Sequence, residues 1–298
     1  MTEFRSIGKF EYRAPDSLPG VLKILEAEKT ACKVLAGGTD LILQMKQGLA
    51  CPSFVLDVKQ VPELNRLEWS EKEGLGIGGA VPIGRLLAFT ELPNEFDILR
   101  QACSLIGSTQ IKNRGTIGGN ICNAAPSADS APPLLCLEAR VVLASNKANR
   151  TIPLDDFFLT PGKTAIAADE LLVKIEIQTP PVPSAGCYLR HTTREEMDIA
   201  VAGVASFLTL SPQTGQLRSA RIALGAVAPT PIRVPEAEAF LEGKKITKAI
   251  IEEAAEKAAE TADPISDLRA SSKYRRELVR VLTRRTLKRA CQSLGVEV

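Results

Sequence analysis

The sequence contains a single histidine, His191, and its seven cysteines are scattered without any C-x-x-C pair. A catalytic triad built on histidine would have to use that one residue. Zinc and iron–sulfur sites need closely spaced cysteine or histidine ligands, and a disulfide framework needs paired cysteines, so none of these is indicated. These absences remove most metal-site and triad-based functions from consideration.

Charge and hydropathy also lack any strong bias. The 298 residues include 37 Lys and Arg and 35 Asp and Glu, a net charge of +2, which gives no general attraction to nucleic acid or membranes. No run approaches the roughly 18 apolar residues of a membrane span, and the first residues lack the apolar core of a signal peptide. We therefore expect a cytoplasmic protein with no membrane span and no nucleic-acid partner.

What the sequence does contain is a glycine-rich stretch from Arg114 to Pro133, RGTIGGNICNAAPSADSAPP. Its three glycines permit close backbone approach, so that successive N–H groups can converge on an anion such as a diphosphate. We predict a loop that holds a phosphorylated cofactor, not a periodic core element. Cys122 lies inside this loop, where we interpret it as a small filler near the cofactor.

A second glycine turn follows an expected strand, Cys32 to Ala36. The turn, Gly37-Gly38-Thr39-Asp40, leads into a helix that Thr39 or Asp40 can cap and Gly48 can end. Such a turn can need glycine for steric reasons alone, or it can bind the same diphosphate from a second side. Neither turn matches the dinucleotide fingerprint or the P-loop, which disfavours both of those folds.

The remaining pattern predicts two unlike halves joined by a proline-rich connector, residues 179–184. Before it we expect strands at 54–58, 75–80, 139–144 and 171–177 and helices at 18–25, 82–92 and 98–106. After it we expect three long antiparallel strands, at 187–190, 199–210 and 217–227, and helices at 235–242, 247–261 and 272–294. The last helix has a basic face that suits solvent, a docked subunit or nucleic acid.

Three segments resemble one family. Their sequences are AGGTDLILQMK (36–46), NRGTIGGNICNAAPSADSAPPLL (113–135) and REEMDIAVAGVA (194–205), and they are similar to the FAD-binding (medium) subunit of the molybdenum hydroxylases, the xanthine dehydrogenase and carbon monoxide dehydrogenase type. The resemblance covers essentially the whole chain. It implies an α+β protein: a p-cresol-methylhydroxylase-type FAD-binding domain (1–178) of two α/β subdomains (about 1–57 and 58–178), and a C-terminal α+β domain (185–298).

The resemblance also implies which residues contact FAD, and it implies neither a catalytic side chain nor a metal site in this chain. The implied cofactor-binding residues are Val34, Leu35, Ala36, Gly37, Gly38, Thr39, Asp40, Leu41, Ile106, Thr116, Ile117, Gly118, Gly119, Asn120, Asn123, Asp129, Leu172 and Arg190. Two of them depart from the family pattern. Arg190 stands where several members have a lysine, and Ile106 where some have an aromatic ring.

The implied function is electron transfer. The FAD would receive electrons from a small [2Fe–2S] subunit, which takes them from a large molybdenum-cofactor subunit, and would pass them to a soluble acceptor such as NAD. A heterotrimer that pairs into a dimer is the family expectation. Two alternatives stay open: a free-standing flavin oxidoreductase with its own substrate pocket, and a non-catalytic scaffold whose glycine turns are only structural.

Overall fold

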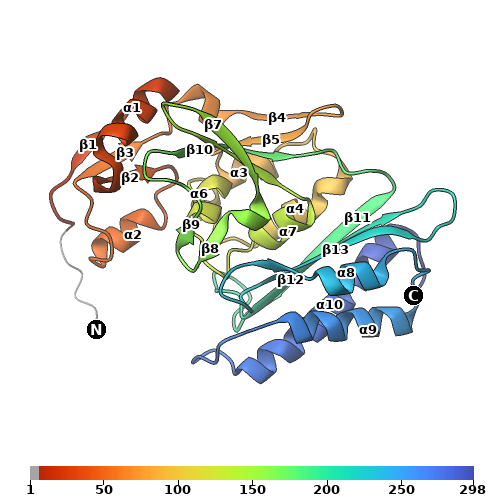
Figure 1. Ribbon diagram of the computed structural model, residues 1–298. Coiled ribbons are helices and arrows are strands. Elements are labelled where there is room, and N and C mark those ends of the chain that lie inside the picture. The colour runs from red at the N-terminus through yellow and green to blue at the C-terminus, as the bar shows by residue number, and fades with distance from the viewer. Residues whose placement is uncertain (1–6) are drawn as a thin grey trace.

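The computed structural model describes residues 7–298, and the chain begins with a small parallel sheet (Figure 1). Its strands lie in the order β1 (Glu11–Arg13), β3 (Phe54–Asp57), β2 (Cys32–Leu35). Helix α1 (Leu18–Glu28) packs on this sheet through Val21, Leu22 and Leu25, the spacing that predicted it. Helix α2 (Leu41–Lys46) follows the glycine turn after β2.

The second sheet is antiparallel and has five strands. They lie in the order β4 (Leu67–Ser70), β5 (Gly74–Gly78), β10 (Leu171–Ile177), β6 (Arg140–Ala144), β7 (Asn149–Pro153). Between β5 and β6 the chain forms α3 (Ile83–Leu87), α4 (Asp97–Ser104), α5 (Thr109–Lys112), α6 (Ile117–Cys122) and α7 (Ala131–Cys136). A short hairpin of β8 (Phe158–Thr160) and β9 (Lys163–Thr164) precedes β10. Strands β4 and β7 were not predicted, because neither contains a buried residue and so neither has an apolar run.

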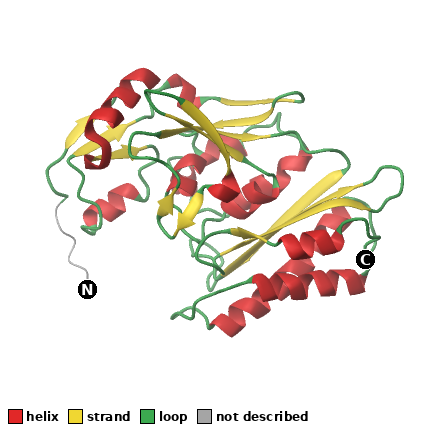
Figure 2. Ribbon diagram, viewed as in Figure 1, coloured by secondary structure: helices red, strands yellow, loops and turns green. Residues whose placement is uncertain are grey.

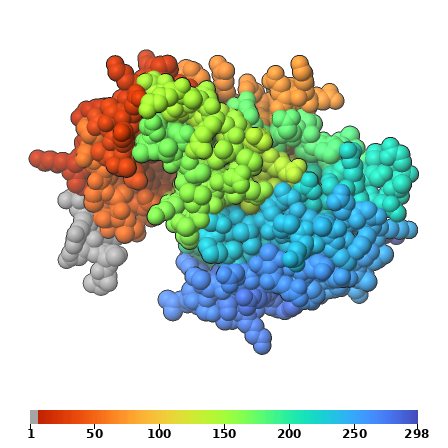
Figure 3. Space-filling view, in the orientation of Figure 1, coloured from red at the N-terminus to blue at the C-terminus, as the bar shows by residue number. Residues whose placement is uncertain are grey.

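The third sheet consists of β11 (Ser184–His191), β12 (Ala202–Leu210), β13 (Leu217–Gly225) and β14 (Ile232–Arg233). Helices α4 and α7 cover one face of this sheet. Helices α8 (Pro235–Leu241) and α10 (Ser272–Ser293) cover the other face, and α9 (Lys248–Thr261) packs against α8 and α10 (Figure 2). Alternate residues of β12 enter different cores, Phe207 on the α7 face and Leu208 on the α10 face. The sheet is therefore buried on both sides. On the face shown in Figure 3, the N-terminal and C-terminal parts of the chain lie in direct contact.

The stretch from Arg114 to Pro133 is not the loop that we predicted, because it contains α6 and the first turn of α7. Thr116 begins α6 by accepting a hydrogen bond from the Gly119 N–H at 2.9 Å. Pro132 and Pro133 lie in the first turn of α7, where a missing N–H leaves no intrahelical bond unmade. All six residues of α7 are buried, so a proline-containing segment forms part of the core.

Helix α10 keeps the predicted bounds within one residue, but its basic residues do not share one exposed face. Arg280 pairs with Glu256 and Arg284 with Glu252, both on α9. Arg275 is only 4% exposed, and its guanidinium donates to the carbonyls of Val201 at 2.7 Å and Ala226 at 3.1 Å. Tyr274, on the same helix, is 47% exposed. Internal pairing thus accounts for part of the basic character of this helix.

Arg275→Leu should lower the free energy of unfolding by about 2–3 kcal/mol, because it leaves two buried carbonyls without donors. Arg285→Leu, at an exposed position of the same helix, should change it by less than about 0.5 kcal/mol. Urea denaturation followed by circular dichroism measures both. Equal effects of the two substitutions would contradict a structural role for Arg275.

Candidate functional site

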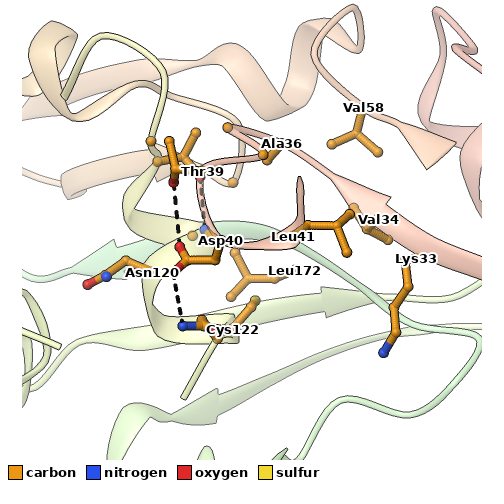
Figure 4. A pocket seen from close by; sticks show the side chains of 18 of the residues that line it. Lys33, Val34, Ala36, Thr39, Asp40, Leu41, Val58, Asn120, Cys122 and Leu172 are labelled. Atoms are coloured by element: carbon orange, nitrogen blue, oxygen red, sulfur yellow. Dashed lines mark hydrogen bonds between the residues drawn. The ribbon is translucent and has the colours of Figure 1, made fainter. Parts of the chain in front are cut away.

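A cavity of ≈ 480 Å³ lies where the glycine turn after β2 meets α6 and the start of β10. It brings together fourteen of the eighteen residues that the resemblance implied. These are Val34, Ala36, Gly37, Gly38, Thr39, Asp40, Leu41, Ile106, Thr116, Gly118, Gly119, Asn120, Asn123 and Leu172. Residues from distant parts of the sequence therefore line one cavity, as the labelled side chains in Figure 4 show.

The two glycine turns touch each other directly at this cavity. A Cβ atom on Gly37 would lie 2.3 Å from the carbonyl oxygen of Arg114 and 2.7 Å from the Cα of Gly115. A Cβ on Gly118 would lie 2.6 Å from the carbonyl oxygen of Gly79. Real side chains cannot approach a backbone so closely, so these positions need glycine for close packing. The sequence predicted that the two turns could converge on one diphosphate, but Gly79 was not among the expected residues.

Several backbone donors at the two turns are unused. Among the described residues, the N–H groups of residues 38–41 and of Gly118 have no hydrogen-bond partner. By contrast, the Gly119 N–H is already bound to the Thr116 hydroxyl. Unpaired backbone donors beside a cavity favour an anionic group, because each such donor otherwise loses a hydrogen bond. A Cβ on Gly119 would meet only the Thr116 Oγ1, at 3.0 Å, so this side of the wall is open.

Polar side chains join α2 to the end of α6. The Gln44 amide donates to the Asn123 Oδ1 at 3.1 Å, and the Asn123 amide donates to the Asp40 Oδ1 at 3.4 Å. Dashed lines in Figure 4 mark the bond to Asp40. Gln44 was not among the predicted cofactor-binding residues, although it follows Asp40 by four residues and so lies on the same side of α2.

The opposite wall is mostly apolar. Ile106 and Leu172 were predicted, while Val58, Leu64, Ile111, Ile166 and Leu171 were not. Leu171 and Leu172 pair in regular register with Ala144 and Leu143 of β6, and they pack in different hydrophobic cores. Because a period-two pattern assigns adjacent residues to opposite faces of a strand, it could not place both of them at the cavity.

Besides Asp40, two charged residues line the cavity, Lys33 and Glu170. Glu170 is engaged within the chain: Arg150 donates to both of its oxygens, at 2.6 and 2.7 Å, and the Ala167 N–H donates at 2.8 Å. These bonds, that of Arg150 first, lower the pKa of the Glu170 carboxyl. Glu170 is thus a carboxylate whose hydrogen bonds hold the segment leading into β10 in place.

Cys122 lines the cavity, as expected of a small filler. Burial raises the pKa of its thiol to about 12, so that the side chain is a neutral thiol at physiological pH. Among residues 7–298, no group of three or more His, Cys, Asp or Glu side chains is placed to hold a metal ion.

Four implied residues lie outside the cavity lining: Leu35, Ile117, Asp129 and Arg190. Ile117 is buried in the core between the second and third sheets. Asp129 and Arg190 form an ion pair with each other, and the Tyr188 hydroxyl donates to the other Asp129 oxygen at 2.7 Å. Burial raises the pKa of the Asp129 carboxyl, and Arg190 and Tyr188 oppose that shift. Both oxygens of Asp129 are therefore bound within the chain.

Comparison with known proteins identifies the family. Residues 8–180 match the FAD binding domain in molybdopterin dehydrogenase, and residues 188–290 match the CO dehydrogenase flavoprotein C-terminal domain. The chain belongs to the family of FAD-binding subunits of molybdopterin dehydrogenases. It is therefore an oxidoreductase subunit of the molybdenum hydroxylase type with FAD as its cofactor, which confirms the family, the enzyme class and the cofactor that the resemblance implied.

The relatives match along nearly their whole length. The xanthine dehydrogenase FAD-binding subunit of Escherichia coli O157:H7 is 31% identical over 285 residues, which cover 95% of this chain and 97% of the relative. The carbon monoxide dehydrogenase medium chain of Hydrogenophaga pseudoflava is 32% identical over 282 residues, with 95% and 97% coverage.

Solved structures agree with the sequence matches. Carbon monoxide dehydrogenase from Hydrogenophaga pseudoflava superposes with a TM-score of 0.91 at 31% identity, covering 96% of this chain and 98% of that one. Quinoline 2-oxidoreductase from Pseudomonas putida 86 gives 0.90 at 29% identity, with 97% and 99% coverage. The predicted α+β fold class is confirmed.

FAD suits the chemistry of this cavity. Its diphosphate is an anion that the unused N–H groups of residues 38–41 and Gly118 can bind, and its ring systems are apolar surfaces that can pack on Ile106, Ile111 and Leu172.

Among the described residues, no helix is both long and apolar enough to cross a membrane.

Gly37→Ala should push the two glycine turns apart, at a cost of roughly 1–3 kcal/mol for an overpacked contact. We expect FAD affinity to fall about tenfold or more, measured as flavin bound per purified chain and as a dissociation constant. Gly8→Ala is the matched control, because nothing lies within 4 Å of its Cβ. A Gly37→Ala protein with a full complement of FAD would show that contact between the turns does not shape the site.

Proposed function

We propose that this chain is the electron-transferring FAD subunit of a complex with a small iron–sulfur subunit and a large molybdenum-cofactor subunit, and that the final acceptor is soluble, such as NAD. Bound FAD supplies chemistry that no side chain can, the exchange of electrons one or two at a time. The single observation that carries the proposal is coverage: the chain spans 97% of relatives named as the FAD-binding subunit or medium chain of larger dehydrogenases.

We assign the chain's own residues to holding the cofactor. The N–H groups of residues 38–41 and Gly118 would bind the diphosphate, and Ile106, Ile111 and Leu172 would flank the flavin. Glu170 braces the wall through Arg150 and is not free to act as a base. We also propose the division into a cofactor-binding part, 1–178, and a C-terminal part, 185–298, because the match to the first family model ends at residue 180 and the match to the second begins at residue 188.

The chemistry of the lining disfavours a free-standing flavin enzyme. Such an enzyme usually needs an acid or base in reach of its substrate. The acids that line this cavity are Asp40 and Glu170, and both accept hydrogen bonds from neighbouring side chains within the described chain. An electron-transfer role needs no such group.

Electron delivery to the flavin tests the proposal. In the anaerobic complex purified with its natural partners, reduction of the iron–sulfur clusters with limiting dithionite should bleach the flavin absorbance, and NAD should then restore it. The complex carrying Gly37→Ala is the control, since its clusters should be reduced with a flavin signal that is smaller in proportion to the flavin it has lost. Reduced clusters beside a flavin that stays oxidised would contradict the electron-transfer role, whereas bleaching that NAD does not reverse would exclude only that acceptor.

A further inference from the structure

Helix α2 is apolar on the side that does not line the cavity. Met45 is its one buried residue, while Ile42 is 44% exposed and Leu43 is 48% exposed. Leu49, just after the helix, is 76% exposed. Figure 1 shows α2 at the edge of the molecule, where these side chains face outward. We call Ile42, Leu43 and Leu49 the α2 face.

The backbone holds Leu49 beside the helix. Gly48 ends α2 with a φ of 72°, and the N–H groups of Leu49 and Ala50 both donate to the Gln44 carbonyl, at 2.9 and 3.3 Å. In helix ends of this kind, an apolar residue after the glycine commonly packs on a side chain of the last turn. Here the Gln44 side chain turns to the cavity, where its amide donates to Asn123. Leu49 therefore has no apolar partner at that position and stays exposed.

A helix that is apolar on several sides is normally buried. Single exposed apolar residues are ordinary on a protein surface, but α2 and its closing turn expose three within eight consecutive residues, 42–49. Burying these side chains against another protein would remove apolar surface from water, which is favourable. The α2 face therefore has the composition of a surface that a partner covers.

The charge beside the α2 face is positive. From Leu41 to Ser53 the chain has one charged residue, Lys46, and no acid. Lys46 is exposed, and so is Lys33, which shares the lining of the cavity with Leu41. Among residues 7–298, neither lysine takes part in an ion pair. A second copy of this chain docked by the same face would add two more unpaired lysines and no acid, whereas a partner with carboxylates around an apolar centre would complement it.

The α2 face also lies close to the cofactor cavity. Leu41 and Gln44 of the same helix line that cavity, and an α-helix with its side chains is about 10 Å across. A subunit docked on the outer side of α2 would therefore be separated from the cavity by one helix. Of the two partners in the proposed complex, the iron–sulfur subunit is the one that must pass electrons to the flavin, so it is the one that needs this proximity.

We propose that the α2 face is the docking surface for the iron–sulfur subunit, and that this subunit presents an apolar centre with carboxylates around it. Leu43 and Leu49 are the central contacts, which supply most of the affinity. Lys46 pairs with a carboxylate of the partner and orients the docking. This inference rests on the proposed electron-transfer function, from which it takes the identity of the donor subunit.

Cross-linking of the intact complex, purified with its natural partners, identifies the occupant. A carbodiimide joins a lysine amine to a carboxylate in direct contact, and peptide mass spectrometry then names both residues. We expect Lys46 to be joined to an acid of the iron–sulfur subunit. Lys245, which is exposed in the C-terminal half of the chain, is the control and should form no link to that subunit. Links from Lys46 to the large subunit or to a second copy of this chain would overturn the proposal.

Leu43→Asp places a carboxylate at the centre of the α2 face, at a residue that does not line the cavity. It should raise the dissociation constant of the iron–sulfur subunit roughly 10- to 100-fold, as the loss of a central apolar contact does. The measurement is iron per FAD in the complex after gel filtration at decreasing concentration. Val182→Asp is the control, since Val182 is 67% exposed in the connector between β10 and β11. Both variants should keep a full complement of FAD.

A Leu43→Asp complex with the iron per FAD of the wild type would overturn the proposal. The absence of any cross-link at Lys46 would also overturn it, because the choice of an acidic partner depends on that contact. Electron delivery in the wild-type complex separates this inference from the proposed function. If the clusters reduce the flavin while Leu43→Asp retains its iron–sulfur subunit, only the docking surface is wrong. If the wild-type flavin stays oxidised beside reduced clusters, the proposed function itself has failed.

Discussion

The close contact between two backbone turns is the constraint on which the rest of this structure depends. Gly37 lies against Arg114 and Gly115, and Gly118 lies against Gly79, at distances that exclude any Cβ atom. The contact joins the small parallel sheet to α6 and to the edge of the second sheet. It also brings together N–H groups that belong to turns 77 residues apart in the sequence, counted from Gly38 to Gly115. Neither turn alone would enclose the cavity.

The third sheet also stabilises this contact between the turns. Because β12 is buried on both faces, the sheet takes part in the core of α4 and α7 as well as in that of α8 and α10. Helix α7 begins directly after Asp129 and Ser130, which are bonded to β11 and to Asn120 of α6, so the position of α6 depends on packing at both of its ends. The N-terminal turns therefore shape the cavity, and the C-terminal half holds one of its walls in place.

Much of this fold could be predicted from the sequence, because long elements carry repeated signals. Helices α9 and α10 and strands β10, β12 and β13 lie within three residues of their predicted bounds, since period and capping agree there. Helices α6 and α7 have six residues each, too few for a period, and their only signals are a capping threonine and prolines that also suit a loop. The pairing of Asp129 with Arg190 crosses 61 residues, a distance over which no local pattern acts.

The distribution of hydrogen bonds around the cavity explains why its functional residues look so ordinary in the sequence. The acids and amides there already have partners within the chain: Gln44, Asn123 and Asp40 are bonded in a row, and Glu170 is bonded to Arg150. Among the described residues, the donors left without partners at the two turns are backbone N–H groups, which every residue type except proline carries and which no motif of reactive side chains can reveal. A site of this kind is recognised from glycines that permit close approach, not from catalytic residues. Its side chains hold a cofactor in place, and the reactivity belongs to that cofactor.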